Sequence, residues 1–140
     1  MYPTKEEILA QAKKIEAGQE TINEIAEWKK IYYKDNWKKT DVKHKLYALY
    51  NLVMRLNTAS REPANCKIEN YQYCYSPDTG TILLDCHHPS ILSTLHEYAH
   101  HLYGISELAA CAWSTKLFAT TFPKEFKKLH WEGHMLKLAK

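Results

Sequence analysis

Residues 91–103 contain the segment that most restricts how this chain can fold. Apolar residues recur there at the spacing of a buried helix face, at Ile91, Leu92, Leu95, Ala99 and Leu102. Within this stretch the sequence reads His96-Glu97-Tyr98-Ala99-His100. Residues four apart lie one turn apart on the same face of an α-helix. The two histidines therefore share one face of a helix whose neighbouring face packs in the core.

Two imidazoles one turn apart can bind the same Zn²⁺ ion. Glu97 follows the first histidine, so it can reach a zinc-bound water without binding the metal itself. A metal ion lowers the pKa of such a water toward neutrality, and an adjacent carboxylate can then act as its general base. The segment predicts a zinc site with His96 and His100 as ligands and Glu97 as the catalytic base. Two surface histidines on an amphipathic helix are the alternative interpretation.

A catalytic zinc usually has a third protein ligand and an open fourth position. Gly104 is typical of a helix end, and Ser106 can cap the helix that follows. If the chain reverses at Gly104, Glu107 opens the second helix beside the end of the first, where an acidic side chain is favoured. Glu107 is therefore the best candidate for the third ligand. The other candidates are His87, His101 and His134.

Two further roles near the metal are open. The oxyanion formed during peptide hydrolysis needs a second hydrogen-bond donor, and the candidates are Tyr103, His130 and His134. Cys111 lies one helical turn after Glu107, where a small apolar side chain favours a position in the core.

The remaining pattern predicts an α+β fold, mostly helical, with a small antiparallel sheet before the histidine-bearing helix. Helices are indicated by capping residues and apolar periodicity after Thr4, Thr21 and Asp41, and residues 57–67 resemble a loop. Alternating tyrosines at 71–75, a turn at 76–80 and an apolar run at 81–85 predict a β-hairpin. Residues 125–140 form an amphipathic tail.

Length and composition exclude several classes of protein. The chain has 140 residues, 45% of them hydrophobic and 25% charged, which suits one domain with its own core. Its apolar runs fall short of the roughly 18 residues of a membrane span, and its start lacks the pattern of a signal peptide. We therefore expect a cytoplasmic protein without membrane contact, whose four cysteines are reduced.

The positive charge is concentrated in one part of the chain. Residues 28–61 hold nine Lys or Arg against two Asp, a net charge of +7. Within them, the segment 28–45 interleaves lysines with Trp and Tyr, which can follow a phosphate backbone and stack on bases. A solvated helix face whose aromatic residues pack inward is the favoured interpretation, with nucleic-acid binding as the alternative.

Residues 95–104, the Ser106-Glu107-Leu-Ala-Ala segment and the aromatic end at Phe122-Pro123 together resemble the ImmA/IrrE type of small zinc metallopeptidase. These are compact gluzincins of bacteria and phages, and the resemblance covers roughly residues 70–123. It implies zinc ligands at His96, His100 and Glu107 and a general base at Glu97. It also implies that a substrate peptide lies along the edge strand formed by Thr81, Ile82, Leu83, Leu84 and Asp85.

The sequence thus predicts one domain over 1–140, with a helical part at 1–60 and a zincin-like metal-binding part at 68–140. We expect a zinc-dependent metallopeptidase that hydrolyses a protein or peptide substrate. A zinc-stabilised binding module is one alternative. The other is a SprT-like DNA-associated protease that uses the 28–45 segment and takes its third histidine ligand from downstream, at His134. The sequence leaves the oligomeric state open.

Overall fold

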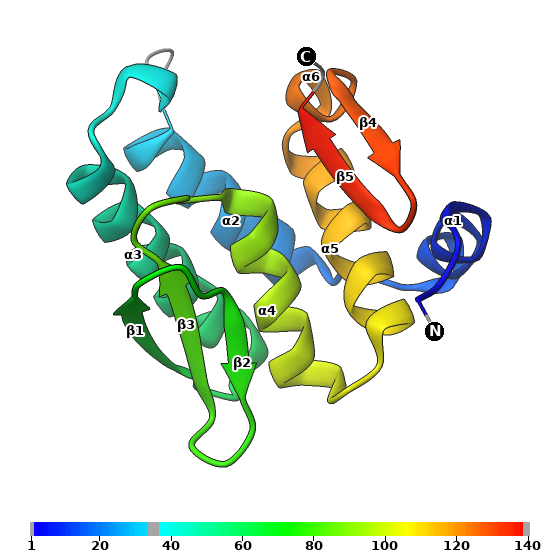
Figure 1. Ribbon diagram of the computed structural model, residues 1–140, viewed down its shortest axis with the longest axis horizontal. Coiled ribbons are helices and arrows are strands. Elements are labelled where there is room, and N and C mark those ends of the chain that lie inside the picture. The colour runs from blue at the N-terminus through cyan, green and yellow to red at the C-terminus, as the bar shows by residue number, and fades with distance from the viewer. Residues whose placement is uncertain (1, 34–36, 139–140) are drawn as a thin grey trace.

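The structure is a computed structural model that describes residues 2–33 and 37–138. It has the mixed α+β architecture that the sequence predicted, with helices in the majority (Figure 1). The N-terminal half contains α1 (Lys5–Lys14), α2 (Gln19–Tyr32), a 3-10 turn (Trp37–Lys39) and α3 (Val42–Ser60). The rest contains β1 (Asn65–Glu69), β2 (Cys74–Ser76), β3 (Thr81–Asp85), α4 (Ile91–Tyr103), α5 (Glu107–Thr121), α6 (Pro123–Phe126), β4 (Leu129–Glu132) and β5 (Met135–Leu138).

Local side-chain chemistry sets the start of two N-terminal helices. Thr4 and Glu7 form a reciprocal cap on α1, in which each side chain accepts a hydrogen bond from the other residue's amide. The Asp41 carboxylate caps α3 by accepting a hydrogen bond of 2.8 Å from the amide of His44. The prediction of a loop over residues 57–67 is wrong at both ends, because α3 continues to Ser60 and β1 begins at Asn65.

The sheet before α4 has β3 at its centre, in the order β1-β3-β2. β2 pairs with β3 antiparallel, as the predicted hairpin requires, whereas β1 pairs with the other side of β3 in parallel. The sheet is therefore mixed. The expectation that Thr81–Asp85 forms a free edge for a substrate is wrong, because both sides of this strand are paired. Ile82 and Leu84 are fully buried, and a strand this apolar belongs at the centre of a sheet.

One hydrophobic core joins the N-terminal helices to the rest of the chain. Trp28 of α2 is fully buried, and its indole N–H donates a hydrogen bond of 2.6 Å to the carbonyl of Ala48 in α3. The ring of Phe122, at the end of α5, meets the Trp28 ring edge-on at 6.4 Å. α2, α3 and α5 thus form a packed support for α4. In the described ranges, every helix is too short or too polar to cross a membrane.

The C-terminal residues form a second, small sheet in place of the amphipathic tail. β4 and β5 pair antiparallel, with Glu132 opposite Met135. The chain turns through Gly133, which has a φ of 63°, and His134. In Figure 1 this hairpin lies beside α5, between the end of that helix and α1. It therefore adds one wall to the region where α4 and α5 meet.

Candidate metal centre

α4 and α5 form a helical hairpin, and the loop between them sets the geometry of the site (Figure 1). α4 ends at Gly104, whose φ of 77° and ψ of −146° suit glycine and few other residues. Ser106 then caps α5, since its hydroxyl accepts a hydrogen bond of 3.1 Å from the amide of Ala109. Together these two residues turn the chain so that Glu107, the first residue of α5, faces the histidines of α4.

The Glu107 carboxylate is the point on which the site converges. Its Oε1 lies 3.1 Å from Nε2 of His96 and 2.7 Å from Nε2 of His100. All three side chains are largely shielded, with exposed fractions of 31% for Glu107, 23% for His96 and 15% for His100. The Glu107 carboxylate thus contacts both predicted histidine ligands through a single oxygen atom, and the two imidazole rings lie edge to face with their centroids 5.0 Å apart.

The orientation of His100 is set by the backbone. Its Nδ1 lies 2.7 Å from the carbonyl oxygen of Gly104. A carbonyl only accepts, so Nδ1 carries the proton and Nε2 of the neutral ring carries a lone pair. A lone pair facing a carboxylate oxygen requires either a second ring proton or a cation between them. Metal-binding histidines are commonly held in this way by a carbonyl on the far nitrogen.

The electrostatic environment favours the metal-binding forms of these groups. Burial lowers the pKa of His96, so its neutral form is favoured. Burial raises the pKa of the Glu107 carboxyl, but the imidazoles of His96 and His100 outweigh this effect, and the net pKa is lowered. A neutral imidazole and an ionised carboxylate are the forms that bind metal ions.

Glu97 lies in a cavity of about 280 Å³ beside these residues. The cavity is lined by His96, Glu107 and side chains from α4, α5 and the β4–β5 hairpin. Burial raises the pKa of Glu97 to about 7; the nearby Glu107 adds to the shift, and His100 opposes it. A carboxylate that titrates near neutrality can both accept and return a proton.

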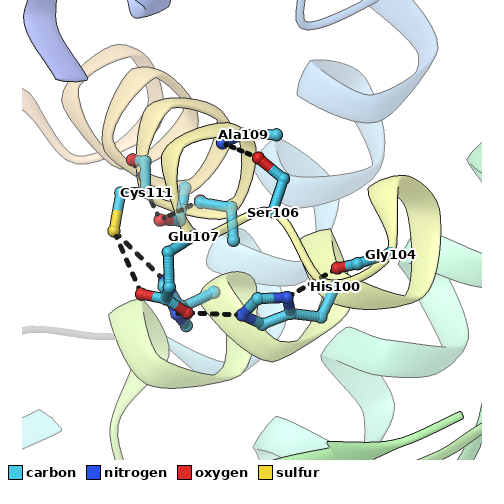
Figure 2. A network of polar contacts seen from close by, with 9 residues as sticks. His100, Gly104, Ser106, Glu107, Ala109 and Cys111 are labelled. Carbon is cyan, nitrogen blue, oxygen red and sulfur yellow. Dashed lines mark hydrogen bonds and ion pairs between the residues drawn. The ribbon is translucent and has the colours of Figure 1, made fainter. Parts of the chain in front are cut away.

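Cys111 belongs to this cluster as well as to the core. Its Sγ lies 3.6 Å from Oε2 of Glu107 and 4.0 Å from Nδ1 of His96. Figure 2 shows the Glu107 carboxylate between the Cys111 thiol and the His100 imidazole. Burial, and then the Glu107 carboxylate, raises the pKa of this thiol to about 12.

His96, Glu107 and Cys111 each offer one ligand atom, and these atoms lie within 4.8 Å of one another. Within the ranges that the structure describes, these three residues form the set grouped closely enough to hold a metal ion, and His100, the other predicted histidine ligand, is outside this set. The spacing of four between Glu107 and Cys111 was the sequence signal for this neighbour. The core position predicted for Cys111 is confirmed, since the residue is buried, and its thiol also contacts the Glu107 carboxylate.

Two of the alternative histidine ligands are engaged elsewhere. The Nε2 of His101 lies 2.7 Å from the carbonyl of Glu62, so it donates, and its Nδ1 accepts from the Tyr75 hydroxyl at 2.9 Å. Both ring nitrogens of His101 are thus used in tying α4 to β2 and to the end of α3. The ring of His87 stacks on Tyr71 with a centroid separation of 4.0 Å.

His134 is the one of the three candidate oxyanion donors that lines the described part of the cavity. It reaches the cavity from the turn of the β4–β5 hairpin, and its ring stacks on Tyr2 at 4.1 Å. Tyr103 is the last residue of α4 and is 47% exposed, outside the described lining. His130 lies on β4 with its Nε2 3.8 Å from the Glu132 carboxylate.

The strand edge nearest the cavity belongs to β2 rather than β3. β2 is an outer strand of the sheet and lies beside α4 (Figure 1). Tyr73, immediately before this strand, lines the cavity together with Glu97. An extended chain that paired with β2 would therefore pass close to the Glu97 carboxylate.

The aromatic residues of the segment 28–45 pack against the core or against one another, whereas most of its described lysines are exposed. Trp28 is buried, and the rings of Tyr33 and Trp37 pack against each other at 5.5 Å at the edge of the core. Lys29 and Lys45 place their ammonium groups over the rings of Phe122 and Trp37, at 4.8 and 5.7 Å. Residues 34–36 of the segment lie outside the described ranges. This packing supports the interpretation as a helix face with inward-facing aromatic residues.

The donor atoms of the cluster are two imidazole nitrogens, carboxylate oxygens and a thiol sulfur, all of which are ligands of Zn²⁺ in proteins. No protein-family model, curated protein or solved structure matches this chain. Function is therefore inferred from the chemistry of the site itself, namely this donor set and the half-buried carboxylate of Glu97 beside it.

Proposed function

We propose that this protein is a zinc-dependent metallopeptidase of the minimal gluzincin type. The observation that carries the proposal is the convergence of His96 and His100 on one oxygen of Glu107, with Glu97 in the adjoining cavity. The first three residues offer donor atoms that suit a metal ion, and Glu97 supplies a second carboxylate that is not one of these ligands. The order of these residues in the chain, which resembles that of the ImmA/IrrE peptidases, adds support.

His96, His100 and Glu107 would hold the zinc ion. A bound Zn²⁺ polarises a carbonyl oxygen and lowers the pKa of a water molecule. Glu97 would accept the proton of the attacking water and deliver it to the nitrogen of the leaving amine. His134 reaches the same cavity and would donate a hydrogen bond to the developing oxyanion.

The substrate in this proposal is an extended segment of protein that adds to the outer edge of β2. Such pairing uses backbone hydrogen bonds, so it recognises an extended chain with little dependence on its sequence. β2 takes the role that the sequence assigned to the strand at 81–85, because β3 is paired on both sides.

The proposal is tested by comparing zinc content and proteolysis in wild-type protein and Glu97→Gln. We expect about one zinc ion per chain in both, and hydrolysis of a labelled unfolded protein such as casein by the wild type. The variant should hydrolyse it at least ~100-fold more slowly, since it lacks the base. Glu132→Gln, on the exposed strand β4, is the matched control and should retain both properties. Proteolysis that survives Glu97→Gln, or zinc content near zero, would contradict the proposal.

A metal-stabilised binding module is the second candidate, and the observation that favours it is the Cys111 thiol beside Glu107. A site closed by four protein ligands serves structure, whereas a catalytic site keeps one position open. In this case zinc content would be the same, but wild-type protein and Glu97→Gln would both be inactive toward casein. Removal of the metal would then abolish folding or partner binding.

A further inference from the structure

We infer that Cys111 supplies a thiolate ligand to the metal ion held by His96 and Glu107. The inference rests on the zinc site of the proposed function and concerns which atoms of His96 and Glu107 hold the ion. It goes beyond the motif, because a ligand set of two histidines and a glutamate contains no sulfur.

The distances around Cys111 are those of neighbouring ligands on one ion. With bond lengths of about 2.0 Å to oxygen or nitrogen and 2.3 Å to sulfur, ligands on a tetrahedral zinc lie roughly 3.3–3.7 Å apart. The Cys111 Sγ is 3.6 Å from Oε2 of Glu107, within this range, and 4.0 Å from Nδ1 of His96. The ligand atoms of His96, Glu107 and Cys111 thus need only a small contraction to share an ion.

The position of Cys111 on its helix explains why the thiol is held there. Glu107 and Cys111 lie one turn apart on α5, so both side chains project toward α4, and both line the cavity. Cys111 is only 5% exposed, which limits its movement. A metal ion that binds a thiol displaces the thiol proton to solvent, so the high pKa of the free thiol does not prevent coordination.

The cluster therefore contains two ligand sets that share the side chains of His96 and Glu107 but use different atoms of them. With His100, an ion would bind Nε2 of His96 and Oε1 of Glu107 and keep one position open. With Cys111, an ion would bind Nδ1 of His96 and Oε2 of Glu107, on the thiol side of the cluster. The second arrangement lacks His100, so it competes with the arrangement that the proposed hydrolysis uses.

Cobalt substitution tests the inference, because Co²⁺ bound to a thiolate has an intense near-ultraviolet charge-transfer band that nitrogen and oxygen ligands do not produce. We expect this band when Co²⁺ is added to metal-free wild-type protein. It should be lost in Cys111→Ser, whose circular dichroism verifies folding, and retained in the matched control Cys66→Ala. It should also persist in a triple variant, Cys66→Ala with Cys74→Ala and Cys86→Ala, where Cys111 is the remaining thiol.

Each outcome separates this inference from the proposed function. Visible Co²⁺ bands without the charge-transfer band would overturn the role of Cys111 and leave the site of His96, His100 and Glu107 intact. A charge-transfer band that survives in Cys111→Ser would also overturn it, because another cysteine would then be the ligand. Absence of any Co²⁺ or Zn²⁺ binding would remove the proposed function together with the inference.

Discussion

The Glu107 carboxylate contacts the imidazoles of His96 and His100 through one oxygen and the Cys111 thiol through the other. In a poorly solvated pocket the imidazoles of His96 and His100 would otherwise compete for protons, and the negative charge of Glu107 reduces this competition.

Replacing Glu107 should accordingly weaken metal binding more than replacing any exposed acid. The neutral amide of Glu107→Gln is a poorer zinc ligand, and we expect zinc affinity to fall at least about tenfold, or ~1.4 kcal/mol. Competition with a chromophoric chelator measures this, with Glu132→Gln as the control that should leave affinity unchanged. Equal affinities in Glu107→Gln and wild type would exclude Glu107 as a ligand.

Cys66 provides a pH dependence remote from the metal centre. Burial in β1 raises the pKa of its thiol from an ordinary value of 9 to about 12. Between these values the unfolded chain has lost the proton and the folded chain keeps it, so stability is complete below pH 9 and falls as the pH rises. The slope has an upper limit of about 1.4 kcal/mol per pH unit, which partial exposure of the thiol reduces.

Urea unfolding at pH 7 and pH 10 measures this dependence against Cys66→Ala. The wild type should lose more stability than the variant between the two pH values, because the variant has no thiol to titrate. If both lose the same amount, the thiol ionises equally in the folded and unfolded chains.

At the scale of elements, the loop between α4 and α5 determines whether the side chains that α5 contributes to the site meet the histidines of α4. Gly104 ends α4 in a backbone conformation that few residues other than glycine adopt. The carbonyl oxygen of Gly104 orients the His100 ring. The open space around its α-carbon means that a substitution there acts through the backbone rather than through a clash.

Gly104→Ala should therefore lower stability by about 1–3 kcal/mol and also weaken zinc binding. Gly18→Ala is the matched control, since Gly18 has a nearly identical φ of 78° but lies before α2. It should lower stability without changing zinc affinity. Denaturant unfolding of the metal-free proteins and chelator competition distinguish the two effects, and unaltered zinc affinity in Gly104→Ala would show that the loop does not position the ligands.

The elements that the sequence predicted well are those with local signals. The caps at Thr4 and Ser106, the helix start at Asp41 and the apolar period of α4 are all formed within a few residues, so they can be recognised without knowing the fold. The cap expected at Thr21 is wrong, because α2 begins at Gln19 and Gly18 stands at its N-cap position. β1 has no such signal. Its side chains are mostly exposed, and it forms a strand because its backbone pairs with that of β3.

The same distinction applies to the site. The spacing of His96, His100 and Glu107 follows from helix geometry and one turn. The participation of Cys111 and the position of His134 depend on how α5 rotates against α4 and on where the β4–β5 hairpin packs, which are tertiary properties. The central position of β3 likewise depends on its pairing with β1, which the sequence pattern does not predict.

At the scale of the whole molecule, a metal ion that binds only the folded chain should stabilise it. At a free zinc concentration 100 times the dissociation constant, the expected gain is about 2.7 kcal/mol. Thermal or urea unfolding with and without zinc measures this gain, which a chelator should reverse and Glu107→Gln should reduce. Unfolding that is indifferent to zinc would mean that the cluster does not bind it in the native state.

The candidate ligands His96, His100, Glu107 and Cys111 all lie in the one hairpin of α4 and α5, close together along the chain. Bringing them together closes only a short loop, which costs far less chain entropy than pairing β1 with β3 or docking α1 on α5. These four side chains can therefore assemble around an ion before the distant contacts form. A metal ion bound by these side chains would thus favour early formation of the hairpin, ahead of the contacts that join distant parts of the chain.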